Sequence, residues 1–322
     1  MSQIIRVEPV AKLNLFLEIP GRRHDGYHDI DTVMVPINWR DTLTLRRSDV
    51  PGIDLQVHCT ESIPNDHRNL VSQALQGVNE RLELQNGWRA DLTKVIPSGA
   101  GLGGASSNAA SAIRAALTWL TRYDTRFASA ELLGPEKMKN LWHPLAAAIG
   151  SDVPFFLDAA DAARATGRGE TLQPIRMAGP LHFVVIYPPE CVSTALVYDR
   201  LGLAPGEPLS ATDARTSDAM IAAMRGDGAS TIADELHNRL QSVTRGLSSR
   251  IDQALQLLLA AGLPSAMMTG SGSACFALAQ SVSHAGAAAD QLARLVSDVK
   301  DLQGALIRPA STCSLPADIF NA

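Results

Sequence analysis

Cysteine, positive charge and long apolar runs are all scarce in this chain of 322 residues. The four cysteines lie far apart and form no Cys-x-x-Cys pair, which excludes a disulfide framework and a cysteine zinc site. We expect free thiols, most simply as small buried hydrophobes, at Cys59, Cys191, Cys275 and Cys313. The formal net charge of −5 leaves no basic footprint for nucleic acid as the main partner.

No apolar run approaches the length of a membrane span, and the longest, residues 257–261, fits a core helix. The first six residues lack the basic and apolar blocks of a signal peptide, so we expect a cytoplasmic protein. Hydrophobic residues make up 46% of the chain and charged residues 19%, which is typical of a globular protein. The length suffices for one large or two medium domains, and it leaves a monomer and a homodimer equally open.

The apolar spacing predicts strands and helices mixed without a strict βαβ rhythm, which indicates an α+β fold. Residues 1–60 have the pattern of strands and turns, and His182–Tyr187 that of a strand. Residues 265–278 predict two strands around a glycine-rich turn, and Gly167–Glu170 predicts a tight turn between two strands. The predicted helices cover residues 66–84, 105–121, 136–149, 214–225, 230–244, 248–261 and 284–300.

The strongest chemical signal is the segment Pro97–Asn108, where four glycines fall within six residues. Glycine allows positive φ and removes the Cβ that would block the close approach of a ligand. A helical pattern follows, with Ile113, Leu117 and Leu120 on one apolar stripe. The loop N–H groups and the free donors of the helix N-terminus can together hold an anion, usually a polyphosphate. The polar residues 106–108 could cap this helix or bind the same phosphate.

Three kinds of loop compete for this segment. The P-loop is excluded because Ala105 and Ser106 follow the last glycine, where a P-loop has lysine and then serine or threonine. The dinucleotide fingerprint G-x-G-x-x-G matches residues 99–104, but it should follow a buried apolar strand, and Trp88–Ile96 alternates in polarity. A tight turn without any ligand is the third interpretation, and it carries the entropic cost of four glycines.

A second candidate for chemistry is the segment Val10–Leu17, which alternates with a period of two. Lys12, Asn14 and Phe16 share one face of the expected strand. Periodicity alone favours a solvated outer face, because exposed lysine is the common case. The alternative is a polar site on this face.

A third candidate is Gly150–Phe156, which follows an alanine-rich helix. Gly150 suits the left-handed end of that helix, and Asp152 then lies at a chain reversal among apolar neighbours. Taken alone, the pattern favours a helix N-cap with Pro154 in the first turn. A carboxylate in such surroundings could also be partly desolvated and serve as a proton acceptor.

Together and in order, these segments resemble the GHMP kinases, which transfer phosphate from ATP to small alcohols, and within them the diphosphocytidyl subgroup. The resemblance implies a two-domain α+β fold. Residues 1–158 would form an ATP-binding domain of the ribosomal-protein-S5-like type, and residues 159–322 a ferredoxin-like α+β domain. The motifs that carry the resemblance cover residues 11–15, 21–28, 97–108, 150–156, 167–170 and 269–273.

The resemblance also implies a reaction. ATP, brought with Mg²⁺, would phosphorylate the 2-hydroxyl of a diphosphocytidyl-methylerythritol in the non-mevalonate isoprenoid pathway. Asp152 matches the catalytic aspartate of the family and would act as the base. Lys12 matches the catalytic lysine, whose charge would keep that carboxylate ionised and offset charge on the phosphoryl group. The ATP-binding residues would be Pro97, Ser98, Gly99, Ala100, Gly101, Leu102, Gly103, Gly104, Ala105, Ser106 and Ser107.

The resemblance assigns substrate contacts as well. Tyr27 and His28, taken alone, are most simply loop aromatics packed on the core. The family instead has a cytosine-binding turn there, where Tyr27 would stack on the base and His28 would hydrogen-bond it. Asn14 and, less closely matched, Thr194 would also hold the substrate. A third family motif, near the substrate diphosphate or the phosphate loop, would use Gly270, Ser271 and Gly272, although a β-hairpin turn accounts equally well for the glycines.

The chain departs from many GHMP kinases at Gly104 and Ala105, where they carry a serine that can ligate magnesium. This departure counts against a mevalonate kinase and leaves the protein ligands of Mg²⁺ unassigned. The region of Asn238 matches loosely and receives no role. Other functions are a homoserine or mevalonate type of kinase, a non-catalytic ligand-binding relative and a dehydrogenase. The cytosine turn argues against the first, and the presence of Lys12 and Asp152 argues against the second.

Overall fold

The computed structural model describes residues 3–85, 87–158, 160–209, 214–228, 231–263, 265–315 and 319–321. The strands are β1 (Ile5–Val7), β2 (Val10–Arg22), β3 (His28–Arg40), β4 (Thr42–Ser48), β5 (Ile53–His58), β6 (Gly87–Thr93), β7 (Ala162–Gly167), β8 (Thr171–Ile175), β9 (His182–Tyr187), β10 (His237–Asn238), β11 (Met267–Met268), β12 (Cys275–Ala279), β13 (Leu306–Ser311) and β14 (Ile319–Asn321).

The helices alternate irregularly with these strands along the chain. The α-helices are α1 (Leu70–Arg81), α2 (Gly104–Tyr123), α3 (Pro135–Lys137), α4 (His143–Ile149), α5 (Val153–Leu157), α6 (Thr194–Asp199), α7 (Asp218–Arg225), α8 (Gln241–Leu247), α9 (Ser249–Ala260) and α10 (Val282–Ser297). Short helical turns of other kinds are η1 (Thr125–Phe127), the π-helical η2 (Met138–Trp142) and η3 (Lys300–Leu302).

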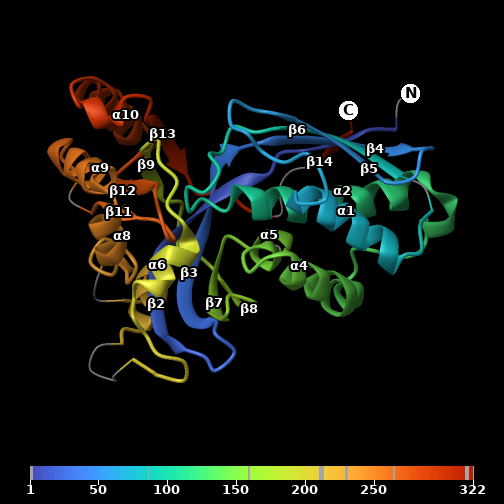
Figure 1. Ribbon diagram of the computed structural model, residues 1–322, viewed down its shortest axis with the longest axis horizontal. Coiled ribbons are helices and arrows are strands. Elements are labelled where there is room, and N and C mark those ends of the chain that lie inside the picture. The colour runs from blue at the N-terminus through green and yellow to red at the C-terminus, as the bar shows by residue number, and fades with distance from the viewer. Residues whose placement is uncertain are drawn as a thin grey trace.

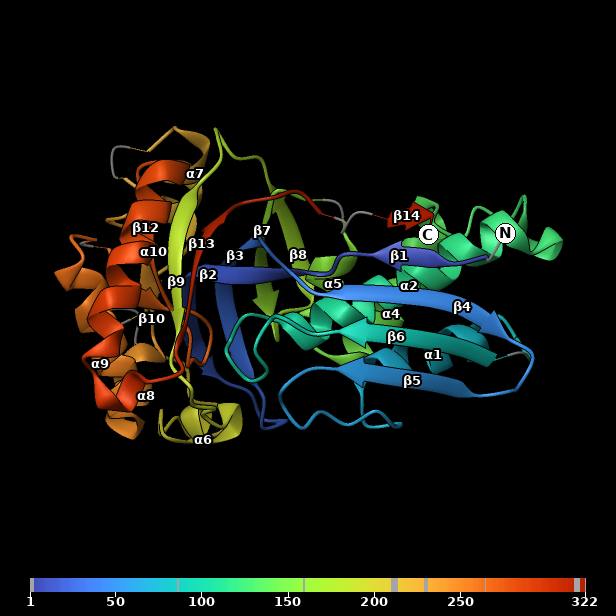
Figure 2. The ribbon, with the colours of Figure 1, turned by 90° about the horizontal axis from the view of Figure 1, so that it is seen from above.

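The described strands form three sheets. The first has the order β14-β1-β4-β6-β5, and α1 and α2 cover one of its faces (Figure 1). The third has the order β11-β12-β9-β13 and packs against α9 and α10. The second, β10-β2-β3-β7-β8, lies between the other two (Figure 2), so its long strands β2 and β3 run through the centre of the molecule. The chain therefore has the predicted α+β, two-domain architecture.

The middle sheet joins distant parts of the chain. It takes β2 and β3 from the N-terminal half, while β7, β8 and β10 come from beyond residue 158. The pairing of β10 with β2 is parallel, and it sets His237 opposite Phe16. The sheet thus connects the two helical layers directly. The exact domain boundary between residues 158 and 159 stays a prediction.

Helix α2 anchors the first layer. The predicted stripe of Ile113, Leu117 and Leu120 is fully buried, as are the alanines between these residues. Alanine favours the helix and lets neighbouring backbones approach closely. The helix begins directly after Gly103, whose left-handed φ of 70° turns the incoming loop into the helix axis. The position of this helix therefore fixes the position of the glycine loop.

The predicted helix over residues 230–244 is wrong. Residue 230 lies outside the described residues, and the described part forms a turn, then β10, and enters α8 only at Gln241. The reason is tertiary, because His237 and Asn238 pair with β2 and so adopt an extended backbone. The helix predicted over 136–149 is present but irregular, since η2 inserts a π-helical turn between α3 and α4.

The four thiols are free, as expected. Cys275 is buried, but Cys59 and Cys191 are exposed and Cys313 is half-buried, so a buried position was wrong for the exposed pair. These thiols lie in loops, where the surrounding sequence gives no periodic signal.

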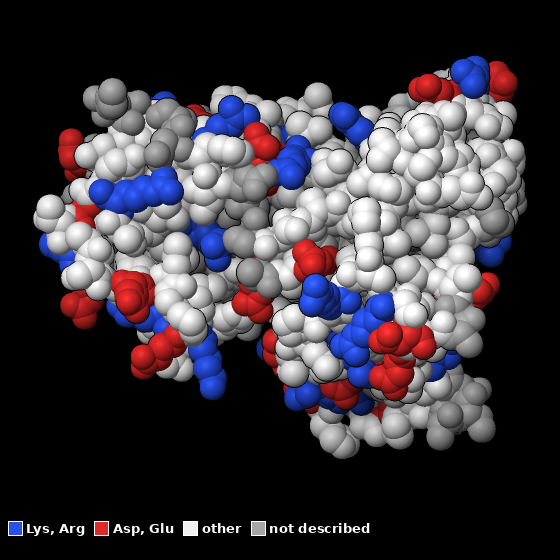
Figure 3. Space-filling model, turned by 180° about the vertical axis from the view of Figure 1, so that it is seen from behind, with Lys and Arg blue, Asp and Glu red and all other residues white. Residues whose placement is uncertain are grey.

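Within the described ranges, no helix combines the length and apolar character needed to cross a membrane. A cytoplasmic location stays a prediction. On the face opposite to that of Figure 1, acidic and basic side chains are interspersed among the described residues instead of gathering into one basic surface (Figure 3). This distribution agrees with the net negative charge of the chain.

Candidate active site

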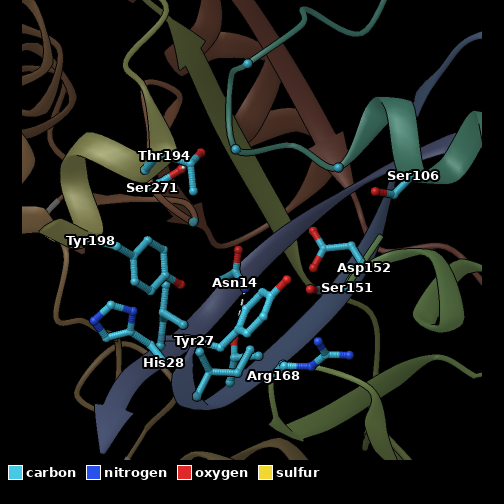
Figure 4. Close-up of a pocket in the computed structure, with 18 of the residues that line it drawn as sticks. Asn14, Tyr27, His28, Ser106, Ser151, Asp152, Arg168, Thr194, Tyr198 and Ser271 are labelled. Atoms are coloured by element: carbon cyan, nitrogen blue, oxygen red, sulfur yellow. Dashed lines mark hydrogen bonds between the residues drawn. The ribbon is translucent and has the colours of Figure 1, made fainter. Parts of the chain in front are cut away.

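A cavity of about 790 Å³ opens where the middle sheet meets the glycine loop before α2. Its wall combines side chains from β2, the turns before β3 and α5, the β7–β8 turn, α6 and the loop after β11 (Figure 4). The structure thus brings together motifs that lie more than 250 residues apart. The predicted site residues in the wall are Lys12, Asn14, Tyr27, His28, Gly99, Gly101, Gly103, Ser106, Asp152, Thr194, Gly270 and Ser271.

The remaining predicted residues belong to the same loops but do not line the cavity. Ala100, Leu102 and Ser107 are buried behind the wall and pack into the protein. The alternation of inward and outward positions along the loop explains why the glycines face the cavity while their neighbours anchor it. Predicted residues outside the wall are Pro97, Ser98, Ala100, Leu102, Gly104, Ala105, Ser107 and Gly272.

Lys12 is buried, with only 3% of its surface exposed, so the solvated face that periodicity favours is wrong. The reason is that the glycine loop covers this face of β2, and the Lys12 N–H donates to the Leu102 carbonyl at 2.9 Å. The Lys12 ammonium donates a hydrogen bond to the Asn14 side-chain oxygen. It also lies 3.8 Å from Oδ2 of Asp152.

Burial and the neighbouring Asp152 have opposite effects on the pKa of Lys12. Removal from water lowers the pKa of the ammonium, and the charge and hydrogen bonding of Asp152 oppose this by raising it. The carboxylate is therefore the group that helps Lys12 to keep its proton. In return, the ammonium places a positive charge beside Asp152 at the edge of the cavity.

Asn14 is oriented by contacts on three sides. Its side-chain nitrogen donates to the hydroxyl of Thr32 at 2.8 Å, and that hydroxyl donates to the Phe16 carbonyl. Its backbone N–H donates to the hydroxyl of Thr269 at 2.9 Å. The amide oxygen is thereby turned toward Lys12 and can only accept. Asn14 thus holds the lysine and links β2 to the loop after β11.

Asp152 occupies the N-cap position of α5, yet its side chain makes no capping hydrogen bond. The N-cap interpretation is therefore correct for the backbone and wrong for the carboxylate. The side chain is one-third exposed and faces the cavity beside Ser106 and Ser151 (Figure 4). Because the helix does not use it, the carboxylate is available to a ligand.

The glycine loop is shaped by left-handed backbone at Gly99, Gly101 and Gly103, with φ between 64° and 76°. A Cβ at Gly101 would lie 2.3 Å from the Thr269 carbonyl oxygen. A Cβ at Gly103 would lie 2.9 Å from the ring of Phe156. The loop therefore has no room for side chains at these positions, and its backbone forms the cavity wall.

The first turn of α2 divides its polar residues between two tasks. Ser106 faces the cavity. Asn108 does not, because it donates to the carboxylate of Asp41 at 2.8 Å and accepts from Lys94 at 3.0 Å. Asn108 was predicted either to cap the helix or to bind phosphate. It instead connects the helix start to Lys94, just after β6, and to Asp41, just before β4.

The loop after β11 lies against the glycine loop. The N–H of Ala274 donates to the Ala100 carbonyl at 3.0 Å. The Asn238 side chain donates to the carbonyls of Met268 and Gly270, at 2.7 and 2.9 Å. The loop connects the antiparallel strands β11 and β12, which confirms a hairpin turn, and it also lies beside the predicted phosphate loop. Contact of Gly270 and Ser271, which line the cavity, with a substrate stays a prediction. Asn238, which received no role from sequence, fixes its position.

The opposite end of the cavity is aromatic. Tyr27 is 57% exposed, so packing on the core is wrong for this side chain. The His28 ring packs against that of Tyr198 with centroids 5.0 Å apart. Nε2 of His28 is buried without a hydrogen-bond partner. Burial, with a smaller contribution from Arg22, lowers the pKa of His28 and favours a neutral imidazole.

Several cavity residues were missed by sequence reasoning. Tyr198 lies on α6, a short helix with little periodic signal, although Ser193 caps it. Arg168 lies at the tip of the β7–β8 turn, within a motif that was predicted to be a turn and counted toward the family resemblance but received no role. Ser151 directly precedes Asp152 and could have been found with it. Thr32 lies on β3 and acts through Asn14, which only the strand pairing reveals.

Comparison with known proteins places this geometry in a family. The family model "GHMP kinases N terminal domain" matches residues 69–157, and "GHMP kinases C terminal" matches residues 220–298. The chain is 46% identical over 345 residues to a 4-diphosphocytidyl-2-C-methyl-D-erythritol kinase of Rhodopirellula baltica, with 100% of this chain and 99% of that protein covered.

Solved structures agree with these relationships. A crystal structure of a 4-(cytidine 5'-diphospho)-2C-methyl-D-erythritol kinase matches with a TM-score of 0.71 and 29% identity, covering 96% of this chain and 99% of that one. A homoserine kinase from Cytophaga hutchinsonii matches with a TM-score of 0.72 at 18% identity, over 99% and 98% of the two chains, which shows the shared fold alone. The chain belongs to the GHMP kinases and, within them, to the family of 4-diphosphocytidyl-2-C-methyl-D-erythritol kinases.

Proposed function

We propose that the chain transfers the γ-phosphoryl group of ATP to the 2-hydroxyl of 4-diphosphocytidyl-2-C-methyl-D-erythritol, a step of the non-mevalonate isoprenoid pathway. The observation that carries this proposal is a single cavity with three chemically distinct parts. A glycine loop suits a polyphosphate, a buried lysine paired with a partly exposed aspartate suits an alcohol, and an aromatic end with an unpartnered imidazole nitrogen suits a base.

The glycine loop would hold the ATP phosphates. Its left-handed glycines leave the backbone bare, and the N-terminus of α2 adds free N–H groups and the positive end of the helix dipole. Ser106 in the first helical turn adds a hydroxyl that faces the same cavity. ATP, when bound with Mg²⁺, supplies the phosphoryl group, and the transfer itself needs mainly positioning and charge neutralisation.

Asp152 and Lys12 would act on the acceptor alcohol. The carboxylate accepts or orients the hydroxyl proton, since no hydrogen bond to α5 competes for it. The Lys12 ammonium, 3.8 Å away, offsets negative charge that develops during transfer. Asn14 keeps the ammonium in place through its amide oxygen.

The aromatic end would bind the cytosine. Tyr27 offers an exposed ring face for stacking, and Tyr198 supports His28 from behind. A neutral His28 can donate or accept a hydrogen bond at Nε2, which is buried and lacks a partner. A bound base edge would satisfy this nitrogen, and its present state otherwise carries a desolvation cost.

We place Mg²⁺ with the ATP and assign it no protein ligand. Among the residues that the structure describes, no three histidine, cysteine or acidic side chains gather as a metal-binding group. Asp152 faces the cavity but is already paired with Lys12, and the Glu61 carboxylate accepts a hydrogen bond from the Ser98 N–H at 3.2 Å. Thr194, which donates to or accepts from Ser271 at 2.8 Å, would complete the wall on the acceptor side.

The test is a coupled assay of ADP release with Mg-ATP and four alcohols: diphosphocytidyl-methylerythritol, mevalonate, homoserine and galactose. We expect turnover with the first alone, and a product whose phosphorus spectrum shows a phosphomonoester at the 2-position. The Asp152→Asn protein, purified in parallel, controls for contaminating kinases. Turnover with mevalonate or homoserine instead would retain the fold and overturn the cytosine site. ATP binding without turnover of any alcohol would favour a non-catalytic relative.

A further inference from the structure

One cationic side chain in the cavity wall has no task in the mechanism above. Arg168 lies at the tip of the β7–β8 turn, and its guanidinium carbon is 4.8 Å from the centre of the Tyr27 ring. Across the described residues, we find no hydrogen bond or ion pair from this guanidinium, and the hydrogen bond of Arg168 to Glu170 comes from the backbone. Through its charge, the guanidinium is one of the smaller contributions that lower the pKa of Asp25. Its five N–H donors therefore face the cavity with capacity for an anion.

The other cations of the wall are already engaged. Lys12 donates to Asn14 and is paired with Asp152. Arg22 donates to the carbonyls of Gly26 and Leu203, at 3.4 and 3.3 Å. Arg168 is thus the cationic group of the described wall that can bind an incoming anion without breaking an existing hydrogen bond or ion pair.

The turn is built to hold Arg168 in this place. Gly167 and Gly169 flank it with φ of 71° and 111°, a conformation that side chains rarely adopt. The backbone N–H of Arg168 donates to the carboxylate of Glu170 at 2.6 Å. A Cβ at Gly169 would come within 3.5 Å of Cβ of Ser151, so the turn packs closely against the residue before Asp152.

Arg168 lies between the two ends of the acceptor site. Its guanidinium touches Tyr27 at the aromatic end, and its turn touches Ser151 beside the catalytic pair. Figure 4 shows the glycine loop that leads to Ser106 crossing the top of the view, whereas Arg168 lies at the bottom, below Ser151. An anion at Arg168 would therefore be a part of the acceptor and not the phosphate chain of ATP.

Resting on the proposed function, we propose that Arg168 binds the diphosphate of the acceptor and makes the enzyme specific for a nucleoside diphosphate over a neutral nucleoside. The diphosphate joins the cytidine to the alcohol, so it must pass between the aromatic end and Asp152. A guanidinium can bind phosphate oxygens through two parallel hydrogen bonds, which a lysine at this position cannot reproduce in full.

The experiment compares two inhibitors that differ in the diphosphate alone. Inhibition constants of CDP and cytidine are measured against the acceptor at saturating ATP. For the unaltered enzyme we expect CDP to bind much more tightly than cytidine. In Arg168→Met, the constant for CDP and the acceptor KM should both rise roughly 10- to 100-fold, with the cytidine constant and the ATP KM unchanged. Arg168→Lys should recover part of this loss.

Two further variants separate the explanations. Tyr27→Ala should weaken CDP and cytidine by the same factor, because it removes base stacking and leaves the charge. Arg294→Met, on the exposed face of α10, should change none of these constants. Circular dichroism and melting temperatures check that each variant is folded.

Each outcome decides the proposal. Equal weakening of CDP and cytidine in Arg168→Met would mean that Arg168 only supports Tyr27, and unchanged constants would mean that another group holds the diphosphate. An unaltered enzyme that binds CDP no better than cytidine would also overturn it. Absence of acceptor turnover by the unaltered enzyme, in contrast, would indicate failure of the proposed function itself.

Discussion

At the scale of single residues, Lys12 depends on Asp152 for its charge. Burial lowers the pKa of Lys12, and Asp152 is the group that raises it again. Without this carboxylate, burial to 3% exposure would strongly disfavour the protonated form of the lysine. In this pair the aspartate is the more exposed partner in the cavity wall, and the lysine is buried beside it.

Asp152→Asn should lower kcat by roughly 100- to 10,000-fold, the range for loss of a general base, with ATP and acceptor affinity retained. Because the neutral amide no longer raises the pKa of Lys12, the residual activity should also fall with rising pH earlier than in the unaltered enzyme. Steady-state kinetics between roughly pH 6 and 10 check both effects. Asp227→Asn, exposed and away from the cavity, is the matched control. Full activity of Asp152→Asn would remove the base assignment.

The sequence predicted the identity of these residues better than their surroundings. Ordered motifs pointed to Lys12 and Asp152, yet periodicity alone would have put Lys12 in solvent. The difference arises because the cover over β2 comes from Leu102 and Thr269, and no local pattern records such distant neighbours. Arg168 was missed for the same reason, because only the folded structure shows that its guanidinium lies beside the Tyr27 ring.

At the scale of elements, two glycine-containing loops support each other through backbone contacts. Gly101 packs so closely against the Thr269 carbonyl that there is no room for a side chain, and the Ala274 N–H donates to the Ala100 carbonyl. The loop before α2 and the loop after β11 therefore form one continuous wall. A substitution in either loop should therefore change the affinity of ligands that contact both loops.

Gly101→Ala should raise the ATP KM more than 10-fold and lower the melting temperature. The new Cβ would meet the Thr269 carbonyl at 2.3 Å and would also occupy a left-handed backbone, which costs about 1 kcal/mol or more. The matched control is Gly286→Ala within α10, where a Cβ would meet nothing within 4 Å. That substitution should raise stability by about 0.5–1 kcal/mol, as expected inside a helix. Equal behaviour of the two variants would contradict a packed loop.

Elements with strong local patterns were predicted well, and those made by distant pairing were not. The buried stripe of α2 and the apolar run of β9 carry their own signals. The short strand β10 does not, because only its pairing with Phe16 and Leu17 of β2 makes it a strand. The helix predicted across it, over residues 230–244, followed local composition and was therefore wrong.

At the scale of the whole molecule, Glu18 ties the central strand to the C-terminal part of the chain. It is fully buried and accepts hydrogen bonds from His237 at 3.0 Å and from Arg239 at 2.7 Å. The backbone N–H groups of Ile19 and Arg215 donate to it as well. Burial would raise the pKa of Glu18, but these hydrogen bonds outweigh it and lower the pKa to about 2.

The pKa of Glu18 is 4.5 in the unfolded chain and about 2 in the folded one. The ionised Glu18 therefore stabilises the fold fully at pH values above 4.5, and this stabilisation is lost as the pH falls from there toward about 2. The shift corresponds to roughly 3 kcal/mol. Glu18→Gln should therefore destabilise the protein at pH 7 and flatten its acid unfolding between about pH 5 and 2. Urea unfolding across this range tests it. The exposed Asp66, paired with Arg68, supplies the control Asp66→Asn, which should have little effect. Identical acid profiles for the two variants would contradict the role of Glu18.

The strand β14 pairs with β1 in antiparallel register, with Ile5 opposite Asn321. The last strand of the chain therefore completes the sheet that the first strand begins. During synthesis, β1 must wait for more than 300 later residues before its outer edge is covered, and until then its free N–H and C=O groups can recruit other strands. A chain truncated before residue 319 would thus contain every residue that lines the candidate cavity and yet expose a sheet edge that can pair with other chains.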